Sequence, residues 1–343
     1  MSDLIRPAAT TNSATTMATI LQDRYGAQPE DVLRIGQRPV PAVGTGEVLV
    51  RVEASSVDRG TWHIMSGLPY PVRLAGFGLR QPKAANPGRN LAGTVAAVGA
   101  GVTGFAPGDE VYGSGTATFA EYALARPARL ARKPVGLSFA QAAVVPISGL
   151  TALQAVRDNG RVRSGQRVLI TGAAGGAGTF AVQLAKAFGA EVTAVASTAK
   201  LDAVRGIGAD HVIDYTCQDF LGDGRRYDVI IDIAGNRGLS DLRRALTPQG
   251  RLVIAGGETS GKLLGGTDRQ LRAQLLSPFV SQKLGTFIAS ENADGLEDLS
   301  ELIGSGKVAP VLDHTYPLAD TAAAVRHLLD GRTIGKLAVS VAA

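Results

Sequence analysis

Residues 169–200, "LITGAAGGAGTFAVQLAKAFGAEVTAVASTAK", decide the fold. Their first residues complete an apolar run that starts at Arg167, "RVLIT", and this run predicts a buried strand. A turn of small residues, "GAAGGAG", follows, and "TFAVQLAKAFG" then has apolar residues at helical spacing up to Gly189. "EVTAVAS" predicts a second strand. Strand, glycine-rich turn, helix and strand together form the unit from which parallel sheets are built.

The same alternation of strands and helices continues to about residue 290, through segments such as "HVIDY", "YDVIIDIAG", "LSDLRRALTP" and "RLVIAGG". Short links between them predict an α/β domain with a doubly wound parallel sheet. Before residue 130, short strands and turns such as "GEVLVRVEASSV" and "FAPGDEVYG" predict a mostly antiparallel, barrel-like domain. Ser138 precedes the first helical segment as an N-cap, and we expect the final strand, "KLAVSVAA", to return to the first domain.

We therefore place the doubly wound domain at residues 144–289. It is inserted between two parts of the mostly β domain, residues 17–143 and 290–343, and residues 1–16 are expected to be a flexible extension. A length of 343 residues agrees with two domains.

Composition and charge exclude several classes of protein. No run of about 18 apolar residues occurs, so we expect no membrane-spanning helix. A single cysteine, Cys217, excludes an internal disulfide framework, and the four histidines show no metal-ligand spacing, which together favour a cytoplasmic protein. The net charge of +5 comes from dispersed residues. It suits a site for anionic phosphates better than nucleic acid as the main partner.

The glycine-rich turn has the chemistry of a dinucleotide site. Backbone N–H groups at a helix start, together with the helix dipole, favour an anion. Two glycines let a pyrophosphate come close, and a third lets the helix pack on the strand. The alternative is a glycine-rich turn that binds nothing. The candidate cofactor contacts here are Ala174, Gly175, Gly176, Ala177 and Gly178.

The end of the second strand concerns the choice of cofactor. NAD-binding folds usually have an acidic residue there, which binds the ribose hydroxyls. This chain has Ala196-Ser197-Thr198-Ala199-Lys200 instead. Ser197 and Thr198 can donate hydrogen bonds and Lys200 supplies positive charge, so the sequence favours NADPH over NADH. The alternative is an exposed Ser/Thr cap followed by a solvated lysine.

Five motifs carry a resemblance to a known family. They are "AAGGAG" at 173–178, "GFAPGDEVYG" at 104–113, "FAEYALA" at 119–125, "IGADHVIDY" at 207–215 and "GKLAVSV" at 335–341. With them the chain, from Met17 to its end, resembles the zinc-free quinone oxidoreductases of the medium-chain dehydrogenase/reductase superfamily. The resemblance implies a Rossmann NADP-binding domain inserted in a GroES-like catalytic domain, with the cofactor in the cleft between them. It also implies a homodimer, for which the strand "RLVIAGG" could be the exposed pairing edge.

The resemblance also implies positions for further cofactor contacts. Thr151 would lie near the nicotinamide, and Tyr215 near the adenosine 2′-phosphate. The backbone of a strand from Phe287 to Ala289 would meet the nicotinamide amide. Gly256 and Gly257 would end a strand that faces the cleft, and Lys336 would lie near the cofactor. For Tyr215 and Phe287, ordinary core packing is the alternative.

Zinc-dependent relatives bind the metal through an early cysteine and a Gly-His-Glu stretch. This chain has "ASSVDRG", including Ser55, at the first place and Gly88-Arg89-Asn90 at the second. Neither stretch has the needed ligands, so we predict a site without metal and no ion that acts as a Lewis acid.

The active-site loop departs from the family pattern, Ala-Ser-Val-Asn-Pro, because Asp58 stands in place of the asparagine. Asn90 in turn replaces the usual aspartate of a Pro-Gly-x-Asp stretch. We expect Asp58 to accept a hydrogen bond from a ribose hydroxyl or to pair with Arg59 or Arg73, and so to position groups and donate no proton.

The following loop, residues 58–80, is expected to cover the acceptor, with an apolar wall that includes Trp62, Met65, Tyr70 and Phe77. Tyr70 or His63 could hydrogen-bond the acceptor oxygen. Alternatively, His63 caps the loop and Trp62 fills the core. The candidate catalytic residues are therefore Asp58, Tyr70 and His63.

The chemistry that these features predict is hydride transfer from C4 of NADPH to a quinone or a similar electron-poor carbonyl acceptor. Water can protonate a reduced quinone, so no protein acid is required. An alkenal or enone double-bond reductase would use the same site. A low-turnover NADPH-binding sensor or scaffold protein is the alternative outside enzymes.

Overall fold

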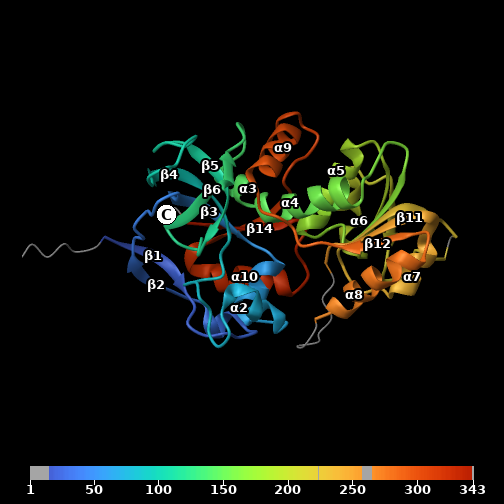
Figure 1. Ribbon diagram of the computed structural model, residues 1–343, viewed down its shortest axis with the longest axis horizontal. Helices are drawn as coiled ribbons and strands as arrows, with labels where there is room; N and C mark the ends of the chain where they lie inside the picture. The colour runs from blue at the N-terminus through green and yellow to red at the C-terminus, as the bar shows by residue number, and fades with distance from the viewer. Residues whose placement is uncertain (1–14, 223, 257–264, 342–343) are drawn as a thin grey trace, which may run out of the picture.

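The computed structural model describes residues 15–222, 224–256 and 265–341, which form two six-stranded sheets and one two-stranded sheet with helices around them (Figure 1). The predicted extension, residues 1–16, lies outside this range except for its last two residues, and Thr16 already belongs to a strand. Gly257 also lies outside it. None of the described helices is long and apolar enough to cross a membrane.

The first sheet has six parallel strands in the order β12-β11-β10-β7-β8-β9. Their bounds are β7 Arg167–Thr171, β8 Glu191–Ala196, β9 His211–Asp214, β10 Tyr227–Asp232, β11 Leu246–Ile254 and β12 Lys283–Thr286. The helices that alternate with these strands are α5 Gly176–Ala187, α6 Leu201–Gly206, α7 Leu239–Ala245 and α8 Thr267–Leu276. The strand order reverses between β7 and β10, so a crevice opens there at the carboxyl ends of the strands. The predicted doubly wound sheet is confirmed.

The second sheet has the order β13-β14-β3-β4-β5-β6, and β3 also pairs with β6, which closes four strands into a barrel. Its strands are β3 Val48–Val57, β4 Asn90–Val98, β5 Glu110–Thr116, β6 Tyr122–Arg132, β13 Leu312–Pro317 and β14 Lys336–Ser340. A hairpin of β1 Thr16–Leu21 and β2 Arg34–Pro39 lies beside it. Because β14 pairs antiparallel with β3, the end of the chain returns to the first domain, as the sequence predicts.

The remaining helices are α1 Pro29–Val32, α2 Arg59–Ser66, α3 Phe139–Ala143, α4 Pro146–Leu153, α9 Ala293–Gly304 and α10 Thr321–Leu329. Short 3₁₀ turns cover Thr198–Lys200, Ser277–Phe279 and Leu318–Asp320, and π turns cover Arg73–Phe77 and Gln154–Asn159. Ser138 caps α3 as predicted: its hydroxyl accepts from the Gln141 N–H. Pro146 starts a separate helix, α4, because proline fits the first helical position but lacks the N–H that a helix interior needs.

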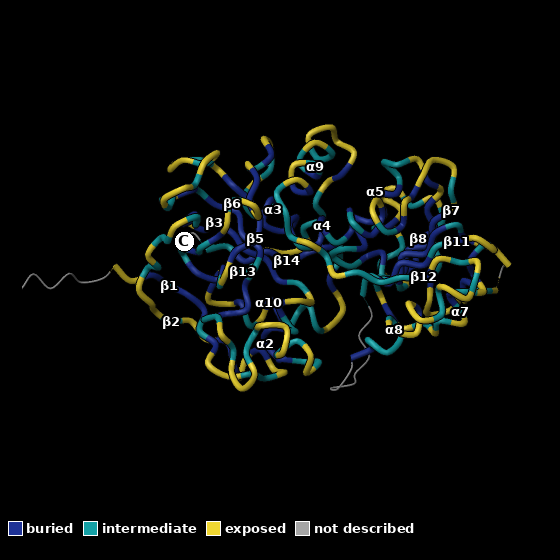
Figure 2. Tube along the Cα trace, viewed as in Figure 1, coloured by how far each residue is buried: buried dark blue, intermediate teal, exposed yellow. Residues whose placement is uncertain are grey.

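Burial explains why the first sheet forms where it does. Val168, Leu169 and Ile170 of β7 are fully buried, since helices cover both faces of the sheet. Figure 2 shows the buried residues gathered in the strands of both sheets, with exposed residues in the outer loops.

Two expectations about strands in this region are wrong. β11, which contains most of "RLVIAGG", lies between β10 and β12 and therefore cannot be a pairing edge; the edge strand is β12. The apolar side chains of Leu252, Val253 and Ile254 suit this interior place, since they are buried. Phe287 to Ala289 are not a strand, because β12 ends at Thr286 and these residues follow it.

Candidate functional site

A cavity of about 580 Å³ lies at the carboxyl ends of β7, β8 and β9. Its walls come from both domains. The doubly wound domain contributes the glycine-rich turn after β7 and the end of β8. The other domain contributes Arg59 at the start of α2, Leu328 of α10, and three residues that follow this helix, Gly331, Thr333 and Gly335. The volume lies within the range of about 300–1,000 Å³ that is usual for small-molecule sites.

The glycine-rich turn forms one wall of this cavity through Ala174, Gly175 and Gly176. Gly175 is the N-cap of α5, and no side chain caps the helix, so its first N–H groups are available to an anion. Gly178 has a packing role, because a Cβ there would lie 2.1 Å from the carbonyl oxygen of Gly172. Ala177 is half-buried in the first turn of α5 and does not line the cavity.

The residues after β8 divide into two groups. Ser197 and Lys200 line the cavity, as does Tyr215 after β9. Thr198 does not, and its hydroxyl donates to Asp214 Oδ2 at 2.5 Å. Hydrogen bonds from Thr198 and Thr216 lower the pKa of Asp214 to about 2.

Lys200 contacts the other domain as well as the cavity. Its ammonium group donates to the carbonyl oxygens of Gly331, at 2.7 Å, and Thr333, at 2.8 Å. Burial lowers its pKa, and the negative charge of Asp313 opposes this effect. A lysine has three N–H donors, so one remains for a ligand. Lys200 is therefore not the solvated lysine of the alternative interpretation.

The charge of the cavity wall is wholly positive. Arg59, Lys200 and Arg237 line it, and no carboxylate is among the described residues that do so. We did not anticipate Arg237 from the sequence, because it follows β10 without any motif.

A buried ion pair holds the segment that carries Arg237. Asp232, at the end of β10, accepts from Thr171 Oγ1 at 2.6 Å and pairs with Arg269 Nη1 at 2.5 Å. Arg269 also donates to the carbonyl oxygen of Arg237 at 2.9 Å. Arg269 comes from α8, so no local sequence signal pointed to this contact.

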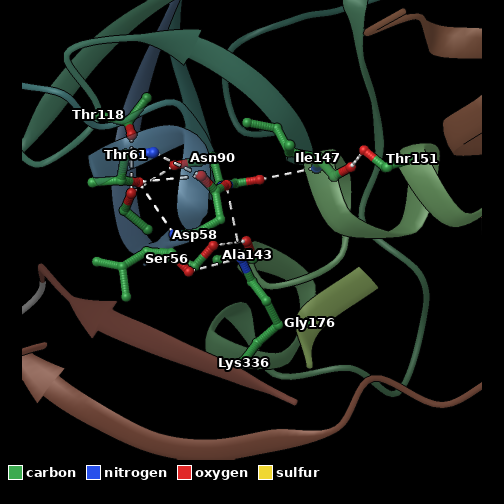
Figure 3. A network of polar contacts seen from close by, with 12 residues as sticks. Ser56, Asp58, Thr61, Asn90, Thr118, Ala143, Ile147, Thr151, Gly176 and Lys336 are labelled. Atoms are coloured by element: carbon green, nitrogen blue, oxygen red, sulfur yellow. Dashed lines mark hydrogen bonds and ion pairs between the residues drawn. The ribbon is translucent and has the colours of Figure 1, made fainter. Parts of the chain in front are cut away.

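The second part of the site is a polar network around Asp58 (Figure 3). Asp58 caps α2, and its Oδ1 accepts from the Thr61 N–H at 2.9 Å in a capping box. Its Oδ2 accepts from Asn90 Nδ2 at 2.8 Å and lies 3.8 Å from Lys336 Nζ. Lys336 also donates to the carbonyl oxygen of Val57 at 2.8 Å. The charged partner of Asp58 is thus Lys336, while Arg73 lies against the rings of Tyr25 and Tyr70.

The ionisation of this pair follows from its surroundings. Burial alone would raise the pKa of Asp58, but the Lys336 charge and the hydrogen bonds from Thr61 and Asn90 outweigh it and hold that pKa below its usual value. Burial lowers the pKa of Lys336, and Asp58 opposes this effect. The side chain of Lys336 is only 3% exposed and that of Asp58 11%. Asp58 is therefore a carboxylate that accepts hydrogen bonds and has no proton to donate.

The network connects both domains to the glycine-rich turn. Asn90 Oδ1 accepts from the Ile147 N–H of α4 at 3.0 Å, and Thr151 donates to the Ile147 carbonyl oxygen at 2.7 Å. On the other side, a Cβ at Gly176 would lie 2.6 Å from Lys336 Cδ. Thr151, Lys336 and Gly176, which the resemblance places near the cofactor, thus belong to one connected region (Figure 3).

The side chains of residues 58–80, the loop that the sequence places over the acceptor, lie in several different surroundings. Met65 is fully buried and Trp62 packs against the same core, so neither belongs to an open wall. His63 Nδ1 lies 2.6 Å from the Leu68 carbonyl oxygen, and His63 lines a cavity of about 220 Å³ together with Gly256. Tyr70 is 43% exposed and lies beside Arg73. None of the three catalytic candidates, Asp58, His63 and Tyr70, lines the 580 Å³ cavity.

Comparison with known proteins agrees with this architecture. Residues 44–155 match the family described as "Alcohol dehydrogenase GroES-like domain", and residues 207–339 match "Zinc-binding dehydrogenase". The chain is 31% identical to the chloroplast envelope quinone oxidoreductase homolog of Arabidopsis thaliana, over 88% of this chain and 92% of that protein. The chain belongs to the quinone oxidoreductase family of medium-chain dehydrogenases/reductases.

Further relatives of this family member are similar over most of its length. The 2-methylene-furan-3-one reductase of Solanum lycopersicum is 31% identical over 90% of this chain and 76% of that protein. The structure of the quinone oxidoreductase from Coxiella burnetii superposes with a TM-score of 0.82 at 27% identity, and the match covers 96% of this chain and all of that one. The predicted GroES-like and Rossmann domains are thus confirmed as the fold of an oxidoreductase family.

The zinc that one matched family carries in its name does not fit the residues of this quinone oxidoreductase family member. Ser55 Oγ donates to the Asn90 carbonyl oxygen at 2.6 Å, and Arg89 donates twice to Glu291, at 2.7 and 2.6 Å. Asp58 is bound to Lys336 and Asn90. Within the described ranges, no three His, Cys, Asp or Glu side chains are grouped so that they could hold a metal. Cationic Arg89 and Lys336 beside these positions would repel a metal ion.

A nicotinamide dinucleotide does fit. The cavity offers open N–H groups at the start of α5 and three cationic side chains. Gly175 and Gly176 both line the cavity, so the backbone of the turn can come close to a pyrophosphate there.

Proposed function

We propose that this protein is an NADPH-dependent oxidoreductase that transfers a hydride to a quinone or a similar electron-poor carbonyl acceptor without a metal. The observation that carries the proposal is the charge of the 580 Å³ cavity. Arg59, Lys200 and Arg237 line it, and no carboxylate does among its described residues. Such a wall favours the additional 2′-phosphate of NADPH, which an acidic residue after β8 would repel.

When bound, NADPH would supply the hydride from C4 of its nicotinamide ring. The α5 N-terminus at Gly175 and Gly176 would hold the pyrophosphate. Ser197 and the remaining N–H of Lys200 would bind the 2′-phosphate. Thr151 and the backbone after β12 would border the nicotinamide, as the family resemblance implies.

The residues around the nicotinamide would position groups and donate no proton. Asp58 is a carboxylate paired with Lys336, and it fixes the start of α2 through the Thr61 N–H. Asn90 uses Nδ2 for Asp58 and Oδ1 for Ile147. A quinone that takes up a hydride takes its proton from water, so the reaction quinone + NADPH + H⁺ → hydroquinone + NADP⁺ balances without a protein acid.

Oxidation of NADPH, followed by its absorbance with a panel of quinones and enones, tests the proposal. We expect turnover with quinones and a higher kcat/KM for NADPH than for NADH. If the protein binds NADPH but turns over no acceptor, it is a binding protein and not a reductase. If it uses NADPH and NADH equally well, the positive charge of the cavity does not select NADPH.

Enone reduction is the second candidate, and the similarity to a 2-methylene-furan-3-one reductase favours it. An enone reductase would use the same cofactor cavity and the same hydride of NADPH. However, an enone delocalises the incoming negative charge less well than a quinone does. It therefore needs more help from hydrogen bonds to its oxygen. The ratio of quinone to enone kcat/KM in the same panel distinguishes the two candidates.

A further inference from the structure

A second, smaller cavity of about 250 Å³ lies within the barrel domain. It is lined by residues before β4, by the last two residues of β5 and the residue after them, and by one residue of β6. Its apolar part includes Ile64, Phe77, Pro82 and Pro87. Its polar part includes three cations, Lys83, Arg89 and Arg129, and no carboxylate is among the described residues that line it. The cavity is slightly smaller than typical sites for drug-sized ligands, so it suits a small group.

The cations of this cavity exceed the negative charge beside them. Arg89 binds Glu291 through two hydrogen bonds, and Arg129 Nη1 lies 3.6 Å from the same carboxylate. Glu291 also accepts from Ser114 Oγ at 2.6 Å. One carboxylate therefore serves two guanidinium groups, and Lys83 adds a third positive charge.

Arg89 has an unused donor. Its Nε is buried and has no hydrogen-bond partner within the part of the chain that the structure describes. A buried donor without a partner is unfavourable. An anionic group in the cavity would balance the excess positive charge of its lining.

Two residues of the charged cluster at this cavity are close in the chain to residues of the proposed nicotinamide site. Arg89 directly precedes Asn90, whose side chain binds Asp58 and the Ile147 N–H of α4. Glu291 comes two residues after Ala289, in the segment that the family resemblance places against the nicotinamide amide. These connections along the chain are the reason to assign part of the acceptor to this cavity.

We propose that the physiological acceptor carries a carboxylate on a short apolar arm, and that Arg89 and Arg129 bind this carboxylate. The arm would lie against Phe77, Pro82 and Pro87 while the quinone or enone faces the nicotinamide. The proposal rests on the proposed reductase function. Planar guanidinium groups match a carboxylate in shape as well as in charge, which favours this anion.

The test compares two acceptors that differ only in charge. They are 1,4-benzoquinone with a propanoate side chain and the methyl ester of the same compound. In the acid, two methylene groups separate the carboxylate from the ring.

We expect the wild-type protein to have an acid-to-ester ratio of kcat/KM of about ten or more. Arg129→Gln should lower this ratio about fivefold, because Arg129 is partly exposed, and Arg89→Gln about tenfold or more. Arg126→Gln, an exposed arginine of the same strand that does not line the cavity, is the matched control and should leave the ratio unchanged.

The outcomes separate this proposal from the reductase function. A wild-type ratio of one or less, or a ratio that neither arginine variant changes, overturns the proposal even if quinones are reduced. If neither these two compounds nor any acceptor of the panel oxidises NADPH, the reductase function fails, and calorimetric binding of the two compounds in the presence of NADP⁺ tests the carboxylate site by itself. Tighter binding of the acid that Arg129→Gln abolishes and Arg126→Gln keeps supports the carboxylate site; equal binding of acid and ester overturns it.

Discussion

Asn90 Nδ2 donates a hydrogen bond to Asp58 Oδ2 at 2.8 Å. These two residues are the two departures from the family pattern near the active-site loop: a carboxylate replaces an amide at 58, and an amide replaces a carboxylate at 90. The structure shows that they are partners in one contact. This chain thus has one amide and one carboxylate at these two positions, as the family pattern does, but with the two exchanged, and Lys336 Nζ lies 3.8 Å from Asp58 Oδ2.

The exchange predicts strong coupling between positions 58 and 90. Asn90→Asp would set two carboxylates against each other, and Asp58→Asn would leave the buried Lys336 ammonium without its partner. Each single change should lower the free energy of unfolding, by up to about 3–5 kcal/mol where a buried charge loses its partner. The double variant Asp58→Asn with Asn90→Asp should be about 1–3 kcal/mol more stable than the summed losses of the two single variants predict.

Urea denaturation followed by fluorescence of Trp62, the single tryptophan, measures this coupling. Asp202→Asn is the control, because its side chain is 99% exposed. Additive effects of the two single changes would contradict the prediction.

A carboxylate at the end of β8 should change the cofactor preference. Ser197 lines the cavity, whereas Ala199, two residues later, is exposed and does not. Ser197→Asp should weaken NADPH binding about tenfold or more and affect NADH less, because it repels the 2′-phosphate. Ala199→Asp adds the same charge outside the cavity and should change neither affinity by a comparable factor. Fluorescence titration with both cofactors measures the effect; equal losses for NADPH and NADH would argue against a 2′-phosphate site at Ser197.

Two glycines in helices should respond differently to alanine. In Gly178→Ala the new Cβ would meet the Gly172 carbonyl oxygen, so the turn after β7 must shift. We expect a loss of about 1–3 kcal/mol in the free energy of unfolding, together with weaker cofactor binding. Gly206→Ala, where nothing lies within 4 Å, should be neutral or stabilise by up to about 1 kcal/mol. Thermal denaturation compares them, and a stable Gly178→Ala variant with normal cofactor affinity would show that the turn does not need this close approach.

Asp214 should contribute to the sensitivity of the fold to acid. Its pKa of about 2 is lowered by hydrogen bonds from Thr198 and Thr216, and lies below the value of about 3.9 in an unfolded chain. Between these values the unfolded chain binds more protons, so the stabilisation is present above about pH 4 and is lost as the pH falls towards 2. As the pH falls through this interval, the free energy of unfolding of Asp214→Asn should therefore decrease less than that of the wild type. Thr198→Val should also show a smaller decrease than the wild type. Unfolding midpoints at several pH values test this, and identical pH dependence in all three proteins would refute it.

Removal of metal should not affect the reaction. Ser55, Arg89 and Asn90 occupy the positions of zinc ligands in zinc-dependent relatives, and all three are engaged in hydrogen bonds within the protein. Dialysis against a chelator should leave kcat and KM unchanged, and elemental analysis should find no stoichiometric zinc. Loss of activity that added zinc restores would overturn the proposal of a reaction without metal.

Local sequence determined the architecture of the cofactor side. Apolar residues at 167–171 and at helical spacing over 179–189, with small residues between, predicted a strand, a turn and a helix, and the structure has β7 at Arg167–Thr171 and α5 at Gly176–Ala187. These elements can be predicted from the sequence because the spacing of apolar residues shows which face of a strand or helix is buried, and because a turn depends on residues that are neighbours in the chain. The lack of a histidine at 89 and of an acid after β8 was equally plain, since it depends only on residue identity.

Tertiary structure alone decided which side chains meet. Lys336 reaches Val57, 279 residues away, and Arg89 reaches Glu291, 202 residues away. The interior place of β11 likewise depends on the strand order. Thr198, which the sequence offered as a phosphate ligand, donates to Asp214 of the neighbouring strand. These contacts depend on how distant strands and helices are brought together, and periodicity along the chain reports which face of an element is buried but not which partner covers it.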